Sequence, residues 1–163
     1  MIKKIIFLLI IIGTINACSR DDICTEETPT TPLLIITFKN FNNQLFSKSV
    51  DNLTVTTVVD NENIDVVKYS TTDSIAIPLR TGFDFTDYLF IEDDQEDVPG
   101  NTDKVTFNYI RENIYINRAC AFKAIFKELS AEGETDTDNW IQELRVNKFT
   151  VENENETHII IFH

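Results

Sequence analysis

Residues 105–126, VTFNYIRENIYINRACAFKAIF, form the clearest hairpin pattern in the chain. Apolar side chains occupy alternate positions over residues 105–109, which is typical of a β-strand with one buried face. The alternation returns over residues 114–126, where Arg118 interrupts an otherwise small or apolar row. The polar residues 111–113 lie between the two rows and predict a turn, while a bulge near Arg118 would account for its place in the row. The segment therefore predicts two antiparallel strands.

The rest of the domain is built from shorter segments of similar character. Further strands are predicted at residues 33–38, 53–59, 74–79 and 88–91, with a last hairpin formed by residues 140–151 and 157–162. Their β-branched and aromatic side chains suit a pleated surface, and no segment sustains the 3.6-residue period of an amphipathic helix. About eight strands separated by turns predict an all-β fold: an antiparallel two-sheet sandwich of Ig-like or Greek-key type, with a small barrel as the alternative.

The N-terminus has the features of a secretory signal peptide. Lys3 and Lys4 precede an apolar run over residues 5–12, which is too short to span a bilayer as a permanent helix. Cys18 follows Ile15-Asn16-Ala17, the pattern at which bacterial lipoproteins are cleaved and lipidated. The alternative is an ordinary signal peptide with a cysteine nearby by chance. We expect a signal peptide at residues 1–17, a lipidated cysteine and tether at residues 18–32, and a folded domain at residues 33–163.

The chain is strongly acidic. Its 27 Asp and Glu outnumber 14 Lys and Arg, which gives a formal net charge of −13 at pH 7. The surplus is larger without the signal peptide, because that segment holds lysines and no acid. Such a charge repels nucleic acids. Nucleic-acid binding is therefore not expected.

The cysteines predict a disulfide. Assigning Cys18 to lipid leaves Cys24 and Cys120 in an exported, oxidising compartment, where we expect them to pair; the alternative is two free thiols. Residues 25–32 are polar and proline-marked, which is a linker composition. With the bridge, the free tether runs only from Cys18 to Cys24, and its reach falls to about 20 Å at about 3.3 Å per residue. The hypothesis is that the bridge holds the domain close to the membrane.

No catalytic constellation is recognisable. The chain has no G-x-S-x-G, and with four glycines it shows no phosphate-cradling loop. His158 and His163 project to opposite faces of the last strand, and we interpret both as exposed side chains without a shared metal. The acidic residues 92–97 and 134–138 are interpreted as solvated loops, with Ca²⁺ binding as the alternative. We expect no enzymatic activity, no cofactor and no metal site.

Aromatic side chains fall in two settings. Those in predicted strands are expected in the core, namely Phe38, Phe107, Phe122 and Phe126. Phe83, Phe85 and Tyr88 lie in the polar segment 81–88, which predicts a loop. Exposed aromatic side chains on a loop are candidates for a partner or glycan surface. The alternative is that this loop folds back onto the sandwich and buries them.

Three groups of residues carry a family resemblance. They are CSRDDIC at residues 18–24 leading into TPTTPL at 28–33, then Phe107-Asn108-Tyr109 with NIYINRAC at 113–120, and ENETH at 154–158 before an apolar strand. Together they resemble a family of short lipoproteins of unknown function found in Bacteroidota. The resemblance spans most of the mature chain and implies no activity, since the family has no established catalytic residues.

Two shorter motifs concern location. Residues 19–22, SRDD, resemble the acidic signal that sends lipoproteins of this group to the cell surface; the alternative is a solvated linker. Asp73-Ser74-Ile75 resembles the O-glycosylation motif of the group, which makes Ser74 a candidate, although a match of this length also arises by chance. The first motif favours the cell surface over the periplasmic face.

These features predict a non-enzymatic lipoprotein anchored in the outer membrane through lipid on Cys18. We expect its domain to dock onto another envelope protein, such as a β-barrel membrane protein or its assembly complex. The alternative is a surface module that binds a glycan or calcium.

Overall fold

The computed structural model describes residues 24–25, 28–59 and 62–163. The predicted signal peptide, the lipidation site Cys18 and the sorting motif at residues 19–22 lie outside the described residues. Over the described part of the chain the regular structure is all β, as predicted, and no helix there is long and apolar enough to cross a membrane.

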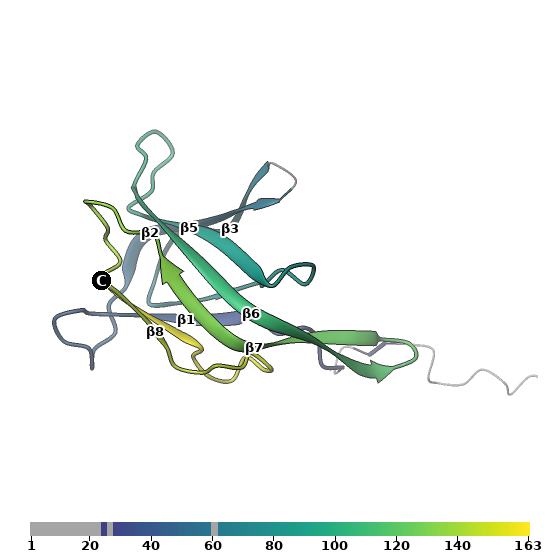
Figure 1. Cartoon of the computed structure of the whole chain (residues 1–163). Coiled ribbons are helices and arrows are strands. Elements are labelled where there is room, and N and C mark those ends of the chain that lie inside the picture. The colour runs from purple at the N-terminus through teal and green to yellow at the C-terminus, as the bar shows by residue number, and fades with distance from the viewer. Residues whose placement is uncertain (1–23, 26–27, 60–61) are drawn as a thin grey trace, which may run out of the picture. The chain divides into compact units, whose positions relative to one another are not determined.

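Nine strands are found among the described residues (Figure 1). They are β1 (Leu34–Lys39), β2 (Val50–Val59), β3 (Glu62–Thr72), β4 (Ser74–Ile77), β5 (Phe85–Glu92), β6 (Asn101–Asn117), β7 (Ala121–Gly133), β8 (Glu143–Val146) and β9 (Ile159–Phe162). Four strands form a sheet in the order β4-β1-β9-β8, and five form a sheet in the order β3-β2-β5-β6-β7. The predicted two-sheet architecture is confirmed, and neither sheet closes into a barrel.

One sheet is mixed rather than wholly antiparallel. The first strand, β1, pairs in parallel with the last strand, β9, with Ile36 opposite Ile159. On its other edge β1 pairs antiparallel with β4, with Ile36 opposite Ile75. A parallel pair requires a connection that returns the chain to the same end of the sheet, and here nearly the whole domain is that connection. The predicted sandwich is confirmed, and this pair departs from its otherwise antiparallel pairing.

The compact unit made of residues 31–113 and 124–163 contains one hydrophobic core. Both sheets contribute alternate side chains to it, as a sandwich requires. Leu34, Ile36 and Phe38 enter from β1, and Tyr88 and Phe90 enter from β5. The other buried apolar side chains of this core include Leu53, Val55, Ile77, Val105, Phe107, Tyr109, Phe126, Leu129, Trp140, Val151, Ile159 and Ile161.

A second compact unit combines residues 114–123 with the N-terminal segment that ends at Thr30. Cys24 and Cys120 are bonded within this unit, with their Cα atoms 5.0 Å apart, so the predicted disulfide is confirmed. The Cys120 sulfur also lies 3.6 Å from the Thr28 hydroxyl.

The turn of the long hairpin lies further along the chain than the sequence pattern predicted. Strand β6 continues through residues 111–113 to Asn117, and the turn occupies residues 118–120. The Asn117 side chain accepts a hydrogen bond from the Cys120 backbone N–H at 2.8 Å, and Ala121 adopts a left-handed conformation with φ of 56°. Asparagine side chains stabilise turns in this way. Polar residues 111–113 lie on an exposed part of the strand, where polarity does not signal a turn.

Strand β3 was not predicted. Most of its side chains are exposed, so it lacks the apolar alternation that marks a strand buried on one face. Its pairing with β2 is interrupted by three register shifts, and Tyr69 has a positive φ of 48°. Bulges of this kind end the regular alternation on which strand prediction depends.

Candidate functional site

The outer face of β5 carries a groove of about 560 Å³. Phe85, Asp87 and Leu89 alternate along β5 on this face, while the residues between them point into the core. Thr56 of β2 and Lys104 of β6 lie on either side of Leu89 in the sheet register. The lining comprises Thr56, Thr57, Val58, Arg80, Phe85, Asp87, Tyr88, Leu89 and Lys104. The groove is therefore a feature of a rigid sheet face.

The groove is less acidic than the chain as a whole. Arg80 and Lys104 are the cations of its lining, and Asp87 is its carboxylate. One oxygen of Asp87 accepts a hydrogen bond from the Thr106 hydroxyl at 2.6 Å, and the other lies 3.6 Å from the Lys104 ammonium. Both oxygens of the Asp87 carboxylate thus interact with side chains of the protein itself. The surface that is left for a ligand is apolar and cationic.

Exposed aromatic rings form the rim of this groove. The rings of Phe83 and Phe85 pack edge to face with centroids 6.1 Å apart, and their side chains are 48% and 42% exposed. The Arg80 guanidinium lies 4.0 Å from the centroid of the Phe83 ring, in cation–π contact. We call Arg80, Phe83 and Phe85 the aromatic rim. Two of the three aromatics predicted as a partner surface therefore lie together and are accessible.

Tyr88, the third predicted aromatic, is among the lining residues but its side chain is not accessible. It is buried in the core on the inner face of β5, and its hydroxyl donates a hydrogen bond to the Pro78 carbonyl. Burial raises the pKa of its hydroxyl well above the usual range. Segment 81–88 was predicted as one loop, but β5 begins at Phe85 and directs Tyr88 inward.

Buried hydrogen bonds hold the aromatic rim in place from below. The Arg80 N–H donates to the Thr86 hydroxyl at 2.9 Å, and the Arg80 carbonyl accepts from the Tyr109 hydroxyl at 2.8 Å. Thr86 and Tyr109 are also hydrogen-bonded to each other at 2.7 Å. A surface whose backbone is already fixed loses less conformational entropy when a partner binds.

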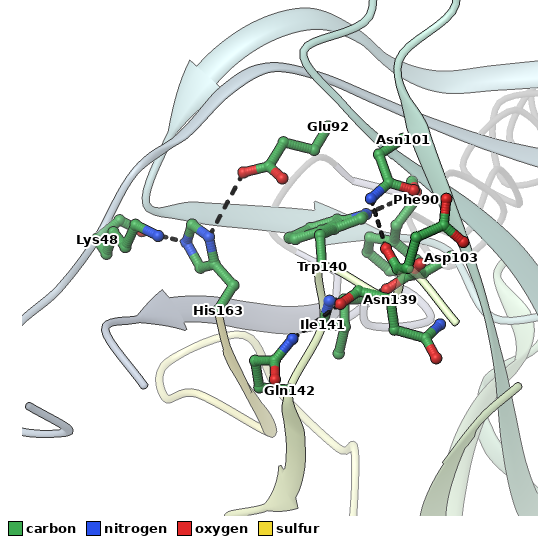
Figure 2. Close-up of polar contacts among 11 residues, drawn as sticks. Lys48, Phe90, Glu92, Asn101, Asp103, Asn139, Trp140, Ile141, Gln142 and His163 are labelled. Carbon is green, nitrogen blue, oxygen red and sulfur yellow. Dashed lines mark hydrogen bonds and ion pairs between the residues drawn. The ribbon is translucent and has the colours of Figure 1, made fainter. Parts of the chain in front are cut away.

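A second cavity of about 270 Å³ lies beside β6, β7 and β8. Asp103 is one of the residues that line it, and only 3% of this residue is exposed. Its Oδ2 accepts a hydrogen bond from the Ile141 N–H at 2.7 Å, while Oδ1 has no hydrogen-bond partner among the described residues (Figure 2). Burial raises the pKa of the Asp103 carboxyl group. Nearby, the Trp140 indole N–H donates to the Phe90 carbonyl at 3.2 Å. Together these contacts fasten the segment before β8 to the five-stranded sheet.

Both histidines are buried, which contradicts the expectation of exposed side chains. His158 Nδ1 accepts a hydrogen bond from the Ile35 N–H at 3.0 Å. The His163 ring packs edge to face against Phe38. It also packs edge to face against Trp140, and its Nδ1 lies 3.7 Å from a Glu92 oxygen (Figure 2). Burial lowers the pKa of both imidazoles. Each ring joins the end of β9 to neighbouring structure, so their role is structural.

The side chains of the acidic segment 134–138 bond within their own turn. In residues 134–139, the Asp136 N–H donates to the Asn139 side chain at 2.7 Å, and the Asp138 N–H donates to the Asp136 carboxylate at 3.0 Å. These side chains therefore stabilise their own turn. Over the described residues, no group of three or more His, Cys, Asp or Glu side chains is placed to hold a metal ion.

Ser74, the candidate O-glycosylation site, is exposed at the start of β4, and its glycosylation stays a prediction.

Phe122 was expected in the core but is 61% exposed, and its ring packs edge to face against Tyr115 with centroids 5.4 Å apart.

Comparison with known proteins identifies a family. The family of unknown function DUF6452 matches residues 52–163, which is more than half of the chain, and the chain therefore belongs to that family. No curated protein and no solved structure matched the chain.

Proposed function

We propose that this protein is a non-enzymatic outer-membrane lipoprotein, anchored through lipid on Cys18, that docks its sandwich onto an integral envelope protein. A β-barrel membrane protein or its assembly complex is the partner class. The N-terminal signal pattern and the resemblance to Bacteroidota lipoproteins support the anchor. The motif at residues 19–22 supports the cell surface over the periplasmic face.

The observation that carries the docking proposal is the aromatic rim above the groove on β5. Phe83 and Phe85 are exposed and paired with each other, and the backbone of the adjacent Arg80 is fixed by hydrogen bonds to Thr86 and Tyr109. Arg80 completes the set. Aromatic and arginine side chains on a preorganised surface are the groups that dominate protein–protein binding energy. Truncation of such a residue typically costs about 2 kcal/mol or more of binding.

A protein partner fits this surface better than a nucleic acid or a lipid headgroup. The chain has a net charge of −13, so it repels polyanions at long range. The groove itself offers apolar side chains together with the cations Arg80 and Lys104. This lining suits a protein segment that combines apolar side chains with carboxylates. A lipid anchor would confine the protein to the membrane in which such partners reside.

Photo-crosslinking in native membranes tests the proposal. A photoreactive amino acid at position 83 is expected to capture one stoichiometric integral membrane protein. The control places it at Phe46, which is 64% exposed on a different loop. Phe85→Ala should abolish capture at position 83, because it removes half of the ring pair, without changing membrane attachment. Equal capture at positions 83 and 46, or capture that survives Phe85→Ala, would refute docking at the aromatic rim.

The second candidate function is glycan binding. The groove combines an exposed ring, Phe85, with hydrogen-bonding groups on Thr56 and Lys104, which is a chemistry suited to sugars. Calorimetric titration with outer-membrane and host glycans separates the two candidates. Binding that disappears in Phe85→Ala, together with an absence of crosslinked protein, would favour the glycan.

A further inference from the structure

The turn of the β6–β7 hairpin carries a compact apolar surface. Tyr115 and Phe122 are 59% and 61% exposed, and their rings pack edge to face at 5.4 Å. Segment 114–123 contains Arg118 and Lys123 but no Asp or Glu, within a chain that has 27 acidic residues. We call Tyr115, Arg118 and Phe122 the hairpin tip.

The disulfide joins the hairpin tip to the N-terminal tether. Cys120 is two residues from Phe122, and it is bonded to Cys24 with a Cα separation of 5.0 Å. The chain between Cys18 and Cys24 spans at most about 20 Å at about 3.3 Å per residue. A lipid on Cys18 would therefore keep the hairpin tip within a short distance of the bilayer surface.

From this combination we infer that the hairpin tip is a membrane-contact site, at which Tyr115 and Phe122 enter the interfacial region of the bilayer. The inference rests on the proposed lipid anchor at Cys18. Tyrosine favours the interface between headgroups and acyl chains, because its ring leaves water while its hydroxyl stays hydrated. Phenylalanine at the same place adds apolar area that is buried in the acyl-chain boundary. Arginine can extend its apolar stem in this region and keep its guanidinium among phosphates. The protein would thus contact the bilayer at two points, through the lipid and through the hairpin tip. Two points of contact restrict the orientation of the tethered protein.

Apolar contact, rather than net charge, carries the interaction. The tether at residues 18–32 contributes Asp21, Asp22, Glu26 and Glu27 against Arg20, which outweighs the positive charge of Arg118 and Lys123. Electrostatic attraction to anionic lipid is therefore weak at this site. The expected determinant is the ring pair, and the salt dependence of the contact should be small.

The test couples residues 18–163 to vesicles through the Cys18 thiol, using a maleimide lipid. Coupling is selective, because the chain has three cysteines and the other two form the disulfide. Phe122→Trp places a fluorescent reporter in the hairpin tip, and Phe46→Trp is the matched exposed control. The single native tryptophan, Trp140, is buried and gives a constant background in both variants. Vesicles of phosphatidylethanolamine and phosphatidylglycerol contain brominated phosphatidylcholine as the quencher.

We expect the emission of Phe122→Trp to shift to the blue and to be quenched several-fold more than that of Phe46→Trp. Replacing both Cys24 and Cys120 with serine should reduce the quenching, because the free tether then extends toward residue 33. The inference would be overturned if iodide in solution quenched the Phe122→Trp reporter freely and brominated lipid quenched it no more than the control. Quenching that persists unchanged without the disulfide would overturn the role of the bridge.

Chemical coupling separates this inference from the proposed function. Vesicle attachment through the maleimide does not depend on lipidation in the cell, so a negative result counts against the hairpin tip alone. Conversely, a native protein whose mass shows no acyl chains on Cys18 would refute the proposed anchor, whatever the vesicle result.

Discussion

Tyr88, Phe90 and Phe107 pack edge to face inside the sandwich, whereas Tyr115 and Phe122 pack edge to face on an exposed hairpin end. The ring geometry is of the same kind in both places. The surroundings differ, because the first set is closed off by both sheets and the second faces solvent. An aromatic pair is therefore no sign of a core by itself. Burial decides whether it contributes to stability or remains available for binding.

The largest effect is expected where the exposed hairpin end is joined to the N-terminus. Replacing Cys24 and Cys120 with alanine removes a crosslink between residues 96 apart in sequence. In the chain-entropy account, a loop of this length stabilises the folded state by about 4–5 kcal/mol. Urea unfolding followed by circular dichroism would measure the loss, with the reduced native protein as a control. A loss below about 1 kcal/mol would show that loop closure is not what the bridge contributes.

The next largest change in stability is expected when a buried ring and an exposed ring are each removed. Phe107→Ala empties a fully buried site and is expected to lower the free energy of unfolding by about 3–5 kcal/mol. Phe122→Ala removes the same side chain from an exposed site and is expected to change it by about 0.5 kcal/mol or less. Chemical denaturation of both variants gives the comparison. Similar losses at the two positions would mean that the hairpin end is covered in solution.

A smaller effect is expected at the buried carboxylate. Asp103→Ala leaves the Ile141 N–H without its acceptor, which should cost about 1–3 kcal/mol. Asp103→Asn keeps an acceptor oxygen of nearly the same shape and removes a buried charge, so it should restore most of the stability. Thermal unfolding of the two variants at neutral pH measures the difference. If Asp103→Asn lowered the stability as much as Asp103→Ala, the negative charge itself would be needed.

Acid is expected to weaken the attachment of β9 through His158. Burial lowers the pKa of its imidazole in the folded protein below the ordinary value for histidine, about 6.5, so the unfolded state binds the proton more readily. The contribution of the neutral ring is complete above about pH 6.5 and is lost as the pH falls toward the folded pKa. His158→Asn offers an oxygen to the Ile35 N–H without titrating, so its stability should fall less between about pH 7 and pH 5. Parallel slopes for the two proteins would contradict this assignment.

The smallest effect on stability is expected at the aromatic rim. Phe83→Ala and Phe85→Ala remove exposed rings, and each should change the free energy of unfolding by about 0.5 kcal/mol or less. Partner capture by a photoreactive residue at position 83 should nevertheless be lost in Phe85→Ala. Calorimetric unfolding combined with crosslinking yield measures the two properties in the same samples. A large loss of stability would place these rings with the core aromatics.

The strand pattern predicted much of the fold, with failures at identifiable places. Alternation marked the buried face of the first half of β6, because one side of that strand faces the core, and apolar runs marked β1 and the second half of β5. It failed for β3, where most positions are exposed, and beyond Tyr109 in β6, where the alternation of burial ends. Hydrophobic periodicity reports burial rather than strand conformation, so a strand exposed on both faces leaves no such signal.

The candidate site was predicted in part. The polar setting of Phe83 and Phe85 suggested accessible rings, and the structure pairs them above a groove. Tyr88 could not be separated from them by composition, because its burial depends on where β5 begins. The groove itself brings together side chains from β2, β5 and β6, and local sequence does not specify which strands are neighbours.

The all-β class and the disulfide follow from local information. β-Branched alternation sets the class, and the interpretation of Cys18 as a lipidation site left Cys24 and Cys120 as the single pair to be joined. The parallel β1–β9 pair, the burial of His158 and His163, and the exposure of Phe122 depend on the folded chain. Each results from contacts between residues far apart in sequence, such as Ile35 with His158. A side chain's environment is set by which segments pack around it, and that packing is a property of the whole fold rather than of any stretch of residues.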